Sequence, residues 1–128
     1  NVQADQLAIN SVDLSGYETL LVTVNIGSGG DALDQANYVE IALEESDNDA
    51  VYTACDDNAV VSSVPGTVTG TIAHIEAIGA GGESFMAAYK GKKRFIRPAI
   101  RMVGNHNNGT IISISALLQN PKYRPLTI

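Results

Sequence analysis

The chain has 128 residues, a net charge of −6 at neutral pH and 17% charged residues, against the roughly 25% that is typical of soluble domains. This length suits one domain with a core of its own. The negative charge argues against a general nucleic-acid binder, because phosphate binding needs a cationic surface. No apolar run approaches the 18 or so residues that span a membrane, and the single cysteine, Cys55, excludes an intrachain disulfide and is expected to be a buried, inert thiol.

The first half of the chain is predicted to be an arm followed by short strands. Residues 1–13 mix polar and apolar residues without a clean period, which favours an N-terminal arm. Beyond it, apolar residues alternate with polar ones and are separated by turn formers. This pattern predicts strands over residues 18–26, 37–43, 50–54 and 59–64.

The second half continues in the same way, with strands predicted over residues 67–78, 84–89, 93–103 and 110–118. In the segment 67–78 the apolar residues do not keep to one set of alternate positions, so a bulge or break is expected near Gly70. Pro98 removes one backbone donor, which places its strand at an edge or interrupts its pairing there.

About eight short strands with frequent turn signals are typical of a β-sandwich, jelly roll or barrel. We expect an all-β fold, a jelly-roll-like β-sandwich with extended terminal arms. In this division, residues 14–118 form the sandwich domain between an arm at 1–13 and an extended, proline-containing tail at 119–128.

Charge is divided along the sequence more sharply than any other feature. All fourteen acidic residues lie at or before Glu83, and all eight Lys and Arg residues lie at or after Lys90. Two uses of this split stay open: the basic stretch pairs with acidic turns of its own chain, or it meets the acids of a neighbouring protein. Under the second use, the interface residues are Lys92, Lys93, Arg94, Arg97, Arg101, Lys122 and Arg124.

The sequence offers no pattern that points to catalysis. The acidic runs at 44–49 and 56–58 have oxygen ligands for a hard cation, but their spacing does not match a calcium loop, and solvated turns are the alternative. His74 is expected to pack or hydrogen-bond across strands, and His106 to be a solvated loop residue. Because there is no nucleophile elbow or phosphate loop, we predict a protein that is not an enzyme, without catalytic residues, metal or cofactor.

A Tyr-x-Gly-Lys-Lys-Arg-aromatic-x-Arg string begins at Tyr89, and shorter segments accompany it at residues 16–20, 45–47 and 118–121, with Pro125 near the end. Together these segments resemble a family of tailed-bacteriophage capsid cement (decoration) proteins. The resemblance spans about residues 14–125. Its most specific part is the string at Tyr89, and the sequence departs from the pattern at Pro98.

Membership of this family implies a jelly-roll-like virion protein on the exterior of the capsid. It would bind the major capsid protein, assemble with itself as a dimer or trimer, and contact no membrane. Two alternatives remain: a carbohydrate- or receptor-binding module of a tail or fibre, and a neck or tail-completion protein. Sugar binding is less favoured by the sequence, since Trp is absent and only five Tyr residues are available.

Overall fold

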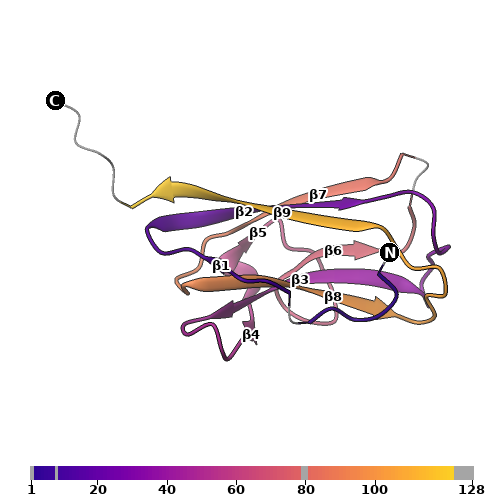
Figure 1. Ribbon diagram of the computed structural model, residues 1–128, viewed down its shortest axis with the longest axis horizontal. Helices are drawn as coiled ribbons and strands as arrows, with labels where there is room; N and C mark the ends of the chain where they lie inside the picture. The colour runs from indigo at the N-terminus through magenta and orange to yellow at the C-terminus, as the bar shows by residue number, and fades with distance from the viewer. Residues whose placement is uncertain (1, 8, 79–80, 123–128) are drawn as a thin grey trace.

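Two antiparallel sheets packed face to face make up the molecule (Figure 1). The computed structural model describes residues 2–7, 9–78 and 81–122. The strands are β1 (Val12–Asp13), β2 (Tyr17–Ile26), β3 (Tyr38–Ser46), β4 (Thr53–Ala54), β5 (Val60–Val61), β6 (Thr71–Ile75), β7 (Glu83–Tyr89), β8 (Phe95–Val103) and β9 (Ile112–Pro121), with a 3₁₀ turn, η1 (Asp57–Ala59), before β5. This arrangement confirms the predicted all-β sandwich.

The two longest central strands each organise one sheet. In the first sheet the order is β5-β7-β2-β9, so β2 lies between β7 and β9. In the second the order is β1-β8-β3-β4, and β6 also pairs with β3. Every strand pair is antiparallel.

The core lies between the sheets, as the alternation predicts. On β2, Leu20, Val22, Val24 and Ile26 are each no more than 2% exposed. Burying one such side chain contributes about 1.5–3 kcal/mol. The facing sheet supplies Val39, Ile41, Leu43, Ile96, Ile100 and Met102.

The strand boundaries differ from the predictions where side chains or long-range pairs decide them. β3 continues to Ser46, because it pairs with β8 over its full length, so the first residues of the acidic run lie in a strand. β9 continues to Pro121, because its pairing with β2 extends as far as Tyr17 opposite Pro121. The predicted break near Gly70 is confirmed: its φ is +75°, a Cβ there would crowd Cys55 and Leu43, and β6 begins only at the next residue.

The N-terminal arm lies against its own chain. Gln6 exchanges two backbone hydrogen bonds with Ile100, and β1 pairs with the start of β8. Since alternate residues of a strand direct their N–H groups to the same side, Pro98 has its missing donor on the arm side, like Ile100. The described arm residues pair with this strand on either side of Pro98, at Ile100 and at Phe95–Ile96.

Candidate functional site

A basic cleft of about 630 Å³ opens at the end of the sandwich where β2 begins. It is built by the turn between β1 and β2, the turn between β7 and β8, and the end of β9. Its charged lining residues are Glu18, Lys90, Lys92, Lys93, Arg94 and Lys122.

A buried tyrosine shapes one wall of the basic cleft. The Tyr89 side chain is fully buried, and its hydroxyl donates to Glu45 Oε2 at 2.7 Å, which links the two sheets. The Tyr89 hydroxyl oxygen in turn accepts from the Lys93 backbone N–H at 3.0 Å, so the turn wraps around the ring. A Cβ at Gly91 would clash with this hydroxyl. Burial, and then the Glu45 carboxylate, raise the pKa of Tyr89, which therefore stays a neutral donor.

Two cations of the basic cleft are neutralised within the chain. Arg94 binds Asp13 through two hydrogen bonds, from Nε at 2.9 Å and from Nη2 at 2.8 Å. These contacts and the Ser15 backbone N–H lower the pKa of Asp13 to about 2. Lys93 Nζ lies 2.7 Å from Asp47 Oδ2. Both pairs are largely exposed, so they orient the turn more than they stabilise it.

The other lysines of the basic cleft have no such partner among the described residues. Among the residues that the structure describes, no carboxylate lies within ion-pair distance of Lys90, Lys92 or Lys122. Glu18 is the one acid in the wall. Three exposed ammonium groups next to a concave surface raise the local potential and favour an anionic ligand.

The predicted interface residues separate into three places. Lys92, Lys93, Arg94 and Lys122 meet in the basic cleft, where they are joined by Lys90, a neighbour in the turn that the predicted set leaves out. Arg124 lies outside the described residues.

Arg97 and Arg101 lie on the outer face of the second sheet, away from the basic cleft. Arg97 donates to Glu44 Oε1 at 2.8 Å, and its guanidinium stacks over the Tyr52 ring at 3.9 Å. Arg101 is opposite Glu40 in the register, yet it has no ion pair within the described part of the chain. Lys93, Arg94 and Arg97 therefore pair with acids of their own chain, which is the first of the two uses of the charge split.

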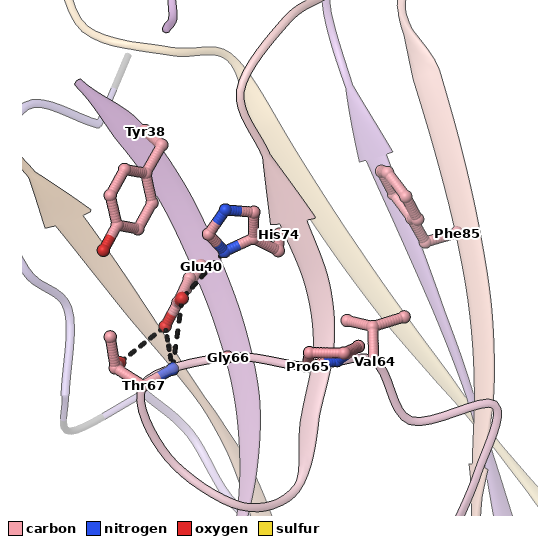
Figure 2. A pocket seen from close by; sticks show the side chains of 8 residues that line it. All are labelled: Tyr38, Glu40, Val64, Pro65, Gly66, Thr67, His74 and Phe85. Atoms are coloured by element: carbon pink, nitrogen blue, oxygen red, sulfur yellow. Dashed lines mark hydrogen bonds and ion pairs between the residues drawn. The ribbon is translucent and has the colours of Figure 1, made fainter. Parts of the chain in front are cut away.

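A second pocket, of about 540 Å³, lies beside a buried carboxylate (Figure 2). Glu40 is 1% exposed and accepts from the Thr67 backbone N–H and from Thr67 Oγ1, the latter at 2.6 Å. Figure 2 shows Glu40 between the loop that carries Thr67 and the His74 ring. The carboxylate thus fastens this loop to the outer face of the sheet.

His74 joins two carboxylates. Its Nδ1 lies 2.8 Å from Glu40 Oε1, and its Nε2 lies 2.9 Å from Glu76 Oε1. The Glu76 contact raises the pKa of His74, burial opposes it, and Glu40 raises it further. Burial would raise the pKa of Glu40, but the hydrogen bonds from Thr67 and His74 outweigh burial and lower it. The predicted cross-strand role of His74 is confirmed.

The other two predicted single residues have different outcomes. His106 is buried, not solvated as predicted: its Nε2 bonds Val103 O at 2.7 Å, and its Nδ1 lies 3.4 Å from Asp31. The Asp31 carboxylate accepts backbone N–H groups of the 105–109 loop, which folds the loop back over the ring. Cys55 is fully buried, as predicted, and burial raises the pKa of its thiol.

No group of His, Cys, Asp or Glu side chains in the described part of the chain is arranged to hold a metal ion. Within those residues, no helix is long and apolar enough to cross a membrane. Comparison with known protein families, with curated proteins and with solved structures finds no match.

Proposed function

We propose that this chain is a capsid cement protein, a structural virion protein of a tailed bacteriophage that binds the outside of the head and bridges neighbouring major capsid subunits. The basic cleft carries the proposal. Lys90, Lys92 and Lys122 present positive charge that the described part of the chain does not neutralise, on a protein of net charge −6. The partner surface is therefore acidic at the contact point. The protein acts by binding and has no catalytic role.

A repeated shell suits a contact of this kind. Each lysine–carboxylate contact at an exposed surface contributes only about 0–1 kcal/mol. Bridging two subunits makes the second contact intramolecular, so weak contacts add up to strong avidity. The nested pairing of β2 with β9 and of β3 with β8 supports the jelly-roll-like wrap that the resemblance implies.

The experiment is to add the purified chain to undecorated phage heads and to titrate salt. Saturable binding to the outer surface that weakens as ionic strength rises is expected, because salt screens exposed charges. Heads that bind no protein at low salt, in the concentration range where other cement proteins saturate their shells, would contradict the proposal.

The alternative that one observation favours is a carbohydrate- or receptor-binding module. The pocket in Figure 2 has Tyr38 and His74 on one wall and Phe85 from the other sheet across from them, and the Tyr38 and His74 rings lie 4.6 Å apart. Aromatic surfaces of this kind suit a sugar ring or a side chain of a receptor. A glycan array tests this alternative, which is supported if the protein binds glycans and does not bind phage heads. Binding only to head–tail junctions would instead support the neck or tail-completion role.

A further inference from the structure

The edge of the first sheet at β9 is long, and no described segment pairs with its outer side. β9 has ten residues and pairs with β2 on one side only. Its sequence, ISISALLQNP, contains no charged residue. Such an edge presents a row of free N–H and C=O groups, which natural proteins usually protect with charge, proline, bulges or short strands.

The other sheet edges in the described part of the chain are short, and the stretch of β7 that β5 leaves unpaired, residues 83–87, carries the charge of Glu83. β1, β4 and β5, which border the sheets elsewhere, each have two residues. β6 has five, and Val64 donates a backbone hydrogen bond to its first residue. On β9 the irregular features come only at its far end, where Asn120 has a φ of +56° and Pro121 follows. Residues 112–118 therefore form a regular, open edge.

The register fixes which backbone groups face outward. Gly27 N–H donates to Ile111 C=O at the start of the β2–β9 pairing. Because alternate residues of a strand point to opposite sides, the next position and every second one after it turn away from β2. The outward-facing groups belong to Ile112, Ile114, Ala116 and Leu118.

The outer face beside this edge is also free of charge. An apolar row crosses the four strands in register, and it consists of Leu117, Leu21, Ala88 and Val61. Leu117 is 59% exposed, next to the edge itself. In a chain of net charge −6, this uncharged edge and face let two copies meet without like charges opposing each other.

We propose that β9 pairs antiparallel with β9 of a second copy, around a two-fold axis at Ser115, to give one continuous sheet across a dimer. In this register Ile112 faces Leu118 of the other copy, and Ile114 faces Ala116. All four outward positions are used, which gives about eight hydrogen bonds, two for each facing pair. The inner side chains of Ile112 and Leu118, which are half-buried in one copy, gain cross-strand contacts. The proposal does not depend on what the basic cleft binds.

Oxidative cross-linking tests the register directly. Ser115 faces its own copy at a non-hydrogen-bonded position, where Cα atoms lie about 4.5 Å apart, within disulfide range. Ser115→Cys is expected to give a covalent dimer under mild oxidation, and the buried Cys55 does not compete. Ser113→Cys is the matched control: it is equally exposed on the same strand, faces Leu117 of the other copy, and should stay monomeric on a non-reducing gel.

Sedimentation of uncross-linked protein tests the pairing itself. The unmodified chain is expected to be a dimer, and Ser115→Lys a folded monomer with the same circular dichroism, because two lysines would meet at the axis. Met86→Lys, on the same outer face but away from the edge, should remain a dimer. A monomeric unmodified chain, a dimer that does not cross-link through Ser115→Cys, or a dimer lost in Met86→Lys, which would indicate stacked faces, would each overturn the proposal.

Discussion

At the scale of single residues, the most constrained group is the Glu40 carboxylate. It is buried on the outer face of a sheet, where the loop at 64–67 covers it, and Thr67 and His74 provide its hydrogen bonds. A buried acceptor that loses its donors costs about 1–3 kcal/mol.

Glu40→Gln should therefore lower the free energy of unfolding by about 1–3 kcal/mol. The NH2 group of the glutamine amide replaces one carboxylate oxygen, and this group cannot accept a hydrogen bond from Thr67. Urea denaturation measures the change. Glu76→Gln is the control, since Glu76 is 43% exposed and solvent can replace its contact, so its effect should be within about 0.5 kcal/mol. Equal effects of the two variants would contradict the assigned role of Glu40.

The contribution of His74 to stability should depend on pH. Its pKa is raised above 6.5, so its charged form stabilises the fold fully below pH 6.5, and the effect is lost as pH rises through the raised pKa. The pKa of Glu40 is lowered from 4.5, so its own contribution is complete above pH 4.5. Between pH 4.5 and pH 6.5 the stabilising contributions of His74 and Glu40 are both complete. The difference in unfolding free energy between the unmodified chain and His74→Gln should be largest there and shrink in alkaline buffer; a difference that stays constant up to pH 9 would rule out the charged imidazole.

At the scale of elements, the β7–β8 turn depends on a fit between one glycine and one tyrosine. Gly91→Ala places a methyl group against the Tyr89 hydroxyl, which Glu45 and Lys93 hold in position. Overpacking of this kind costs about 1–3 kcal/mol, and thermal or urea unfolding will show it. Gly81→Ala, where a Cβ meets nothing within 4 Å, should be close to neutral. If both variants unfold alike, the turn does not rely on this fit.

Elements also show what the sequence can and cannot predict. The alternation on β2 and β8 predicts their inward faces correctly, because one side of each strand contacts the core over most of its length. The length of β9 and the pairing of Arg94 with Asp13 depend on segments about a hundred and about eighty residues apart, which no local pattern reports. Glu40 and His106 were missed as buried groups for the same reason: a distant loop covers the first, and Asp31 folds a loop over the second.

At the scale of the whole molecule, the division of charge along the sequence does not become a division between two faces. Lys93 and Arg97 pair with Asp47 and Glu44 of the acidic run at 44–49. Arg94 pairs with Asp13 of β1. Among the described cations without an acidic partner, Lys90, Lys92 and Lys122 gather at one end in the basic cleft, whereas Arg101 lies on the outer face of the second sheet. The account therefore rests on this end of the sandwich and not on the basic stretch as a whole.

The most direct test is the affinity for undecorated heads of a variant that carries Lys92→Gln and Lys122→Gln. The matched control carries Ala32→Glu and Gln35→Glu, which change the net charge by the same two units. Both positions lie beyond the far end of β2, a strand of 10 residues that begins at the basic cleft. The account predicts that the cleft variant binds heads at least about tenfold more weakly, with a shallower salt dependence, while the control binds like the unmodified chain. Equal binding by the two variants would contradict it.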